Sequence, residues 1–197
     1  MGILAILMCQ ALDLASPRPE ELPRMSLVEW EPQGRHPVEE TFAVDAYALY
    51  TKWDEGLRMH DGWGFGGDLK IDLDWGSSFA LAIKLGYLAW ETDNIVSETF
   101  DAKSKIRQYR IGVGGDFDTE KIDFGIYVVT GLYHFHSVIT DHTDPFFELQ
   151  GSMMLKIVPH LKAGLTAMVD FVGTRYNRAA RHLFTNASIG PTVEVSF

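Results

Sequence analysis

The chain has 197 residues, of which 46% are hydrophobic and 22% are charged, and its formal net charge is −10. This length suits one well-filled domain, and the composition excludes both a disordered chain and a helical membrane bundle. The acidic charge argues against a nucleic-acid-binding surface, because binding phosphates requires a basic footprint. The sequence has no run of eighteen apolar residues, so it predicts no membrane-spanning helix.

The first 40 residues differ in character from the rest of the chain. Residues 1–16, "MGILAILMCQALDLAS", form an apolar stretch that ends in small residues and resembles a shortened secretory signal, although it lacks a preceding basic residue. The alternative is a short buried helix. Residues 17–40 are rich in Pro and Glu and show no period, which indicates an extended segment. Cys9 is the one cysteine of the chain, so we expect no disulfide in the folded part.

From residue 41 onward, apolar and polar residues alternate with a period of two. In "WGFGGDLKIDLDW" (63–75) the odd positions are mostly apolar or aromatic and the even positions are Asp, Lys or Gly. Successive side chains of a strand point to opposite faces, so this pattern predicts a strand with one apolar and one polar face. Similar alternation predicts strands at 41–50, 63–75, 78–90, 108–117, 122–135, 146–157, 161–172 and 187–197. Each predicted strand has at least the roughly 9–11 residues that a tilted strand needs to cross a bilayer.

Short and long connections alternate between the predicted strands. Tight turns are expected near 76–77, 118–121 and 158–160, and long polar links at 51–62, 91–104, 136–145 and 174–184. Antiparallel strands joined in this way bring all the long links to one end. The sequence therefore predicts an all-β fold, an eight-stranded antiparallel up-and-down barrel with four long loops at one end.

The apolar face meets either a dry core, as in a soluble lipocalin-like ligand-binding barrel, or lipid. Aromatic residues lie near both ends of the apolar faces, as expected of two girdles at bilayer interfaces. The predicted girdle residues are Trp63, Trp75, Phe79, Tyr87, Tyr109, Phe117, Phe124, Phe147 and Phe171. Glycines fall mostly on the polar faces, where they make room inside a narrow barrel. These observations favour a transmembrane barrel with a polar lumen.

Together with the ending "VEVSF", the eight alternating strands and the alternating connections resemble the small eight-stranded outer-membrane barrels of the OmpA and OmpX type, over residues 41–197. The resemblance implies a monomer in the outer membrane of a Gram-negative cell envelope, with residues 17–40 in the periplasm. It also implies assembly by the barrel-assembly machinery, which reads a C-terminal strand that ends in an aromatic residue, here Phe197.

Strand parity directs a set of charged side chains into the lumen. The predicted lumen network consists of Asp68, Lys70, Asp72, Lys84, Arg110, Asp116, Glu148, Lys156, Asp170 and Glu194. Buried charges need partners, and eight strands leave little free bore, so we expect the network to plug the lumen. The alternative is a narrow, porin-like pore for small solutes or ions.

The sequence therefore predicts a structural or surface-interaction protein that acts through its four loops, with no cofactor and no catalytic residue. The last loop carries Arg175, Arg178 and Arg181, which are suited to pairing with lipopolysaccharide phosphates; the alternative is a solvated loop. A barrel enzyme that modifies lipid A is a weaker alternative, for which His60 and Asp61 lie in the first link.

The densest group of metal-ligand residue types is "HFHSVITDHTD", which contains His134, His136 and His142 with Asp141 and Asp144. A His-x-His pair on a strand projects both imidazoles to one side, which suits zinc or copper. Such a cluster more often consists of polar residues at a loop tip, so no metal site is assigned from the sequence.

Overall fold

The computed structural model describes residues 38–57, 59–74, 78–97, 100–137, 141–177 and 180–197. Within these ranges the chain forms eight strands and one short 3₁₀ helix. They are β1 (Glu39–Lys52), η1 (Glu55–Leu57), β2 (Gly62–Asp74), β3 (Phe79–Ser97), β4 (Phe100–Asp118), β5 (Ile122–Ser137), β6 (Asp141–Val158), β7 (Leu161–Asn177) and β8 (Ala180–Ser196). The predicted signal segment, nearly all of residues 17–40, and Trp75 lie outside the described residues. No helix in the described part of the chain is long and apolar enough to cross a membrane.

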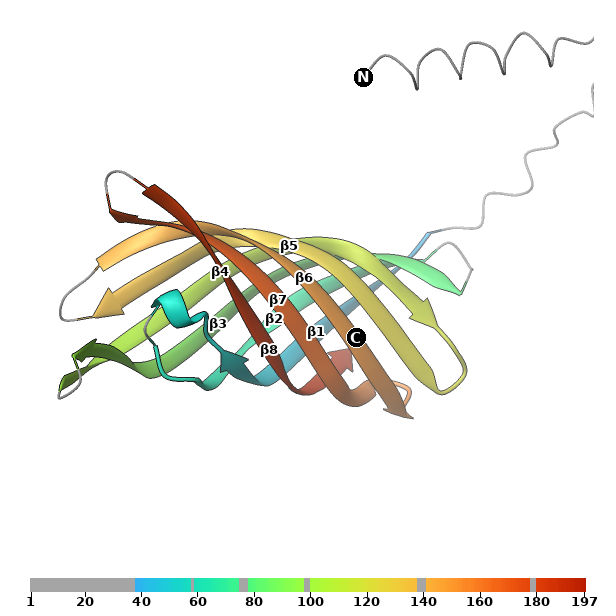
Figure 1. The fold of residues 1–197 in the computed structure, drawn as a ribbon. Coiled ribbons are helices and arrows are strands. Elements are labelled where there is room, and N and C mark those ends of the chain that lie inside the picture. The colour runs from blue at the N-terminus through green and yellow to red at the C-terminus, as the bar shows by residue number, and fades with distance from the viewer. Residues whose placement is uncertain (1–37, 58, 75–77, 98–99, 138–140, 178–179) are drawn as a thin grey trace, which may run out of the picture. The chain divides into compact units, whose positions relative to one another are not determined.

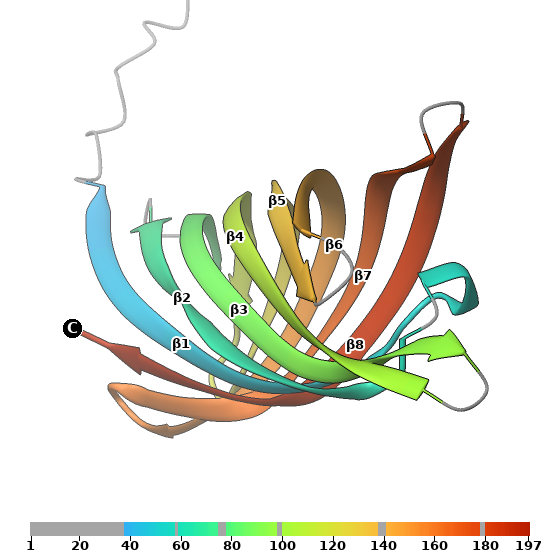
Figure 2. The ribbon, with the colours of Figure 1, turned by 90° about the vertical axis from the view of Figure 1, so that its left-hand side faces the viewer.

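The strands form a closed antiparallel barrel (Figures 1 and 2). Each strand pairs with its neighbours in sequence, and β1 closes the sheet by pairing with β8, where Asp45 lies opposite Glu194. Closure gives every strand two hydrogen-bonded neighbours, which is the arrangement that hydrocarbon demands of backbone N–H and C=O groups. The predicted fold class is therefore confirmed. We call the end where β1 begins and β8 stops the terminal end, and the opposite end, which carries η1, the distal end.

The two faces of the sheet point as the sequence predicts. On β2, the Leu69 side chain is 59% exposed on the outside of the barrel, whereas its neighbour Lys70 is 2% exposed on the inside. On β3, Leu85 is exposed and Lys84 is buried in the same way. The apolar face is thus the outer surface and the charged face lines the lumen, the reverse of a soluble barrel.

Aromatic side chains on the outer face pair across neighbouring strands at two levels. At the terminal end the rings of Phe79 and Phe117 lie 5.1 Å apart, and farther toward the distal end, near the middle of β3, those of Tyr87 and Tyr109 lie 5.4 Å apart. Tyr87 lies eight residues beyond Phe79 on β3, which is about 27 Å along the strand and about 21 Å at a tilt near 40°. This spacing fits the roughly 25 Å apolar band of membrane barrels.

The other described girdle residues also face outward. Trp63, Phe124 and Phe147 are exposed, and Phe171 is half-buried against Phe147, with ring centroids 6.3 Å apart. Three further outward aromatic residues were not predicted as girdle members: Phe42, Tyr50 and Phe65.

The predicted long links 91–104, 136–145 and 174–184 are wrong in extent, because most of their described residues are strand, whereas most of 51–62 does connect β1 to β2. β3 and β4 each have 19 residues and pair as far as Ser97 and Phe100, through the segment 91–104 that the sequence analysis read as a loop. Alternation persists there, since Lys103 and Lys105 point outward while Ser104 and Ile106 are buried. Beyond the lipid a strand no longer needs an apolar outer face, so polar composition does not mark its end.

Candidate functional site: the barrel lumen

The lumen contains two layers of ionic contacts, and Arg110 is the centre of the more distal one. Its guanidinium Nη2 lies 2.6 Å from Glu148 Oε1 and 2.8 Å from Gln150 Oε1, and its Nε lies 3.3 Å from Asp68 Oδ1. Gln108 also donates to Glu148, at 3.1 Å. Side chains from three strands, β2, β4 and β6, thus meet at one buried cation, which is what closing a narrow barrel with charged side chains requires.

Lys70 is the centre of the second layer, nearer the terminal end. Its ammonium lies 2.5 Å from Glu194, 2.9 Å from Asp116 and 3.1 Å from Asp72. Lys162 extends this layer, because its Nζ lies 2.7 Å from both Glu194 and Asp123. All these groups are at most partly exposed, so each cation has its neighbouring carboxylates in place of water.

Lys84 joins the two layers. Its ammonium lies 2.8 Å from Asp45 and 3.9 Å from Asp68, the acid that also faces Arg110. It also lies 3.9 Å from the centroid of the Tyr127 ring, whose hydroxyl donates to Asp116 in the Lys70 layer. A cation over an aromatic face is attracted by the ring quadrupole, so Tyr127 is both a packing and an electrostatic partner.

Tyrosine hydroxyls supply donors to carboxylates in the lumen. Tyr47 donates to Asp68 at 2.5 Å and to Asp45 at 3.1 Å. Tyr133 donates to Asp170 at 2.6 Å, which connects this acid to the network through a neutral donor. The acids in the lumen outnumber the cations, so these neutral hydroxyl donors stabilise the carboxylates together with the lysine and arginine side chains.

Gly86, on the inner face of β3, makes room for the charged network. A Cβ added there would collide with the Asp68 carboxylate, which sits against the bare backbone of β3. Gly64 does the same for the indole of Trp90. These two positions support the expectation that lumen glycines give space to larger partners.

Little space remains within the ionic layers. The cavity bounded by Lys70, Lys84, Asp116, Tyr127 and Thr192, among others, has a volume of about 10 Å³. That is about the minimum needed to hold one water molecule.

The distal part of the lumen is filled by an apolar cluster that the sequence analysis did not predict. We call it the aromatic cap. Its buried members include Leu49, Trp53, Leu57, Leu88, Trp90, Ile106, Tyr133, Phe135, Phe146, Val172 and Phe184. Trp53 is 3% exposed, and its ring lies 5.6 Å from that of Trp90 and 6.4 Å from that of Tyr133. The cap residues on the strands share the inward parity of the charged residues, but parity alone does not show that they meet, and Trp53 and Leu57 lie in the β1–β2 connection and have no strand parity.

The β1–β2 connection holds the cap in place. Asp54 accepts a hydrogen bond from the Thr185 amide of β8 at 3.1 Å, and the Asp54 amide donates to Asn186 at 3.1 Å. Asp61 accepts the Trp53 amide at 3.0 Å. Part of the segment read as a polar link therefore folds into η1 at the distal end, and Asp61 stabilises this connection through the Trp53 amide.

The remaining predicted residues lie at the rims. Lys156 is partly exposed at the terminal end, where its ammonium contacts Asp118 and lies 3.3 Å from Asp123. Phe197 is 76% exposed, and its amide donates to the Phe42 carbonyl at 2.8 Å. Arg178 lies outside the described residues, and the side chains of Arg175 and Arg181 are likewise not described.

Comparison with solved structures identifies the fold. The barrel resembles Neisserial surface protein A with a TM-score of 0.53 and 14% identity, covering 80% of this chain and 97% of that one. It also resembles Ail, the attachment invasion locus protein of Yersinia pestis, solved with the heparin analogue sucrose octasulfate, with a TM-score of 0.50 and 10% identity over 81% of this chain and 99% of that one. No protein-family model and no curated protein sequence matches the chain. The fold is that of the small eight-stranded outer-membrane barrels, as the sequence predicts.

Proposed function

We propose that this chain is a bacterial outer-membrane protein whose lumen is closed by its own side chains and whose distal end interacts with the cell's surroundings. The observation that supports the proposal is the presence of buried, mutually contacting side chains at successive levels of the lumen. Ion pairs centred on Lys70 and Arg110 lie in its terminal and central parts, and Trp53 and its neighbours lie in the distal part.

The outer surface supports a place in lipid. Exposed aliphatic side chains such as Ile83, Ile111 and Val113 lie between the two levels of paired aromatic rings. In water this belt would be a large exposed apolar patch, which soluble monomers rarely carry. A soluble lipocalin-like barrel would instead place the Lys70 face outside.

Cell fractionation and gel migration test the location. We expect the chain to sediment with outer membranes and, after refolding in detergent, to migrate differently before and after heating. Soluble monomer obtained without detergent would contradict the proposal and favour the ligand-binding alternative.

Conductance across a planar bilayer tests the closed lumen. The wild-type barrel should be electrically silent, because the cavity beside Lys70 and Lys84 has space for about one water molecule. A variant that opens all three levels, Trp53→Ala with Arg110→Ala, Glu148→Ala, Lys70→Ala and Glu194→Ala, should conduct. Trp63→Ala, which removes an outward tryptophan, is the matched control and should remain silent. Steady conductance by the wild type would refute closure and support the narrow-pore alternative.

The surface partner that the charge distribution favours is the phosphate of lipopolysaccharide. The predicted residues Arg175, Arg178 and Arg181 lie in or beside the connection between β7 and β8 at the distal end. A second set of cations, Lys103, Lys105 and Arg107, points outward on β4 just distal to Tyr109 of the girdle. Ail, whose barrel resembles this one, was solved in complex with the heparin analogue sucrose octasulfate, which supports the proposal of an anionic partner. Bidentate arginine contacts suit such groups.

Binding to purified lipopolysaccharide separates the two cationic sets. Replacing Arg175, Arg178 and Arg181 with Ser should weaken binding. Replacing Lys103, Lys105 and Arg107 with Ser should also weaken binding, and the set with the larger loss of affinity makes the larger part of the contact. Lys121→Ser, at an exposed lysine of the terminal end, is the control and should bind as the wild type does. Unchanged binding by both triple variants would refute this partner.

A further inference from the structure

We infer that His134, His136 and Asp141 form a binding site for a divalent transition-metal ion, of which Zn²⁺ is the natural probe, on the outer flank of the barrel beyond the distal girdle. This site is separate from the lumen and is not used by the function proposed above.

The position of the three residues follows from strand parity. On β5 the outward positions run from Phe124 to Leu132 along the apolar belt, and His134 and His136 continue the same face. Leu132 pairs with Tyr109 of the distal girdle, so the two imidazoles lie about 7 and 13 Å farther along the strand. They are therefore beyond the apolar belt, at the level of Arg107 and Lys105, with which they pair on β4.

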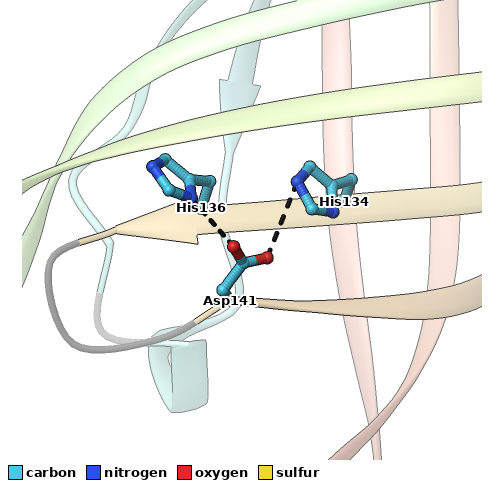
Figure 3. A group of neighbouring side chains, drawn as sticks. All are labelled: His134, His136 and Asp141. Atoms are coloured by element: carbon cyan, nitrogen blue, oxygen red, sulfur yellow. Dashed lines mark hydrogen bonds and ion pairs between the residues drawn. The ribbon is translucent and has the colours of Figure 1, made fainter.

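The pairing of β5 with β6 brings the carboxylate to the imidazoles. Asp141 is directly opposite His136 in the antiparallel register, and Thr143 is opposite His134. Figure 3 shows the Asp141 carboxylate between the two rings, with one oxygen toward each. His136 Nδ1 lies 3.2 Å from Asp141 Oδ2, and His134 Nε2 lies 3.7 Å from Asp141 Oδ1.

The ligand set suits zinc. One ligand atom from each residue lies within 4.8 Å of the others. Tetrahedral zinc with ligands at about 2.0–2.1 Å needs separations of about 3.3 Å, so side-chain rotations that bring the atoms about 1.5 Å closer complete the set. The three protein ligands leave a fourth position open to solvent, as in zinc sites that keep an exchangeable ligand.

One histidine is already oriented by an outer-shell contact. His134 Nδ1 lies 3.1 Å from the Thr143 hydroxyl, which leaves Nε2 directed toward Asp141. A hydrogen bond to the nitrogen that does not bind metal fixes the tautomer and the ring, and it is the usual companion of a histidine ligand. The two rings are also nearly parallel, 16° apart, on a strand paired on both sides.

The neighbouring cations on β4 are Arg107, which pairs with His134, and Lys105, which pairs with His136. The Lys105 ammonium lies 3.6 Å from Glu91 on β3, the strand on the other side of β4. His142 belongs to a different contact, with its ring 5.0 Å from that of Phe135 and its Nε2 3.0 Å from Asp144. The proposed ligand set is thus His134, His136 and Asp141, narrower than the cluster that the sequence suggested.

Calorimetric titration of Zn²⁺ into the full chain, refolded in detergent without a polyhistidine tag, tests the inference. The wild type should bind one ion per chain with a saturable isotherm. His134→Asn, His136→Asn and Asp141→Asn should each weaken binding by more than the roughly 10–100-fold that loss of an outer-shell partner costs, and Thr143→Val by about tenfold.

Two controls make the result specific. His160→Asn removes an exposed histidine at the terminal end and should leave the affinity unchanged. All variants should keep the heat-dependent gel migration of the wild type, since the substitutions lie outside the apolar belt. Absence of saturable binding by the wild type would overturn the inference, as would wild-type affinity in the three Asn variants.

Discussion

Replacing Arg110 with Met removes the cation that holds the central layer of the lumen. Asp68 and Glu148, which lie 3.3 and 2.6 Å from the guanidinium, would then be buried carboxylates with one partner fewer, and Gln150 would lose a donor at 2.8 Å. Breaking a buried ion pair from one side costs about 3–5 kcal/mol, because the stranded charge keeps its desolvation penalty. We expect Arg110→Met to lower the free energy of unfolding by at least about 3 kcal/mol.

Urea-dependent unfolding of the refolded barrel, followed by tryptophan fluorescence, measures this change. Arg107→Met is the matched control, because Arg107 points outward from the same strand, and its effect should stay within about 0.5 kcal/mol. Adding Glu148→Gln to Arg110→Met should cost less than the two changes separately, with a coupling of about 0.5–3 kcal/mol. A cost below about 1 kcal/mol for Arg110→Met, with no coupling, would mean that Arg110 is solvated and that the lumen is wet.

Further substitutions test the inner face, the outer face and the C-terminus. Gly86→Val should destabilise the barrel by about 1–3 kcal/mol in the same urea assay, because the new side chain displaces the Asp68 carboxylate. Gly151→Val is its control and should be nearly neutral, because an added Cβ there meets nothing within 4 Å. Ile83→Arg, midway between the aromatic levels, should cost about 2–4 kcal/mol in lipid vesicles, and a negligible cost would argue against a lipid-facing surface. Phe197→Ala should reduce the amount of barrel in outer membranes while refolding in vitro is kept; equal amounts in cells would remove its role as an assembly signal.

The alternation of the sequence predicted the strands and their faces because a strand has only two sides. Alternation placed Leu69 and Lys70 on opposite faces, and the aromatic residues near both ends of the apolar faces indicated that the Leu69 side meets lipid. The charged residues on the inward parity, among them Lys84 and Arg110, do lie together in the lumen. Antiparallel neighbours in sequence left no other pairing for a closed sheet.

The extent of the strands and the aromatic cap could not be predicted by the same means. In 91–104 both faces are largely polar, so the contrast that reveals a strand is lost although the ladder continues. Trp53 follows β1 and enters the lumen only because Asp54 and Asp61 make hydrogen bonds that hold its connection in place. Such contacts depend on distant partners such as Thr185, which sequence spacing does not bring together.

The orientation of the two faces is measured most directly by spin labels on β3. In a Cys9→Ser background, single cysteines at Leu81, Ala82 and Ile83 place a label at consecutive positions in the middle of the belt. We predict that the labels at 81 and 83 collide readily with oxygen dissolved in lipid, whereas the label at 82 is shielded from both oxygen and a water-soluble nickel reagent. High oxygen accessibility at 82, with 81 and 83 shielded, would contradict the account.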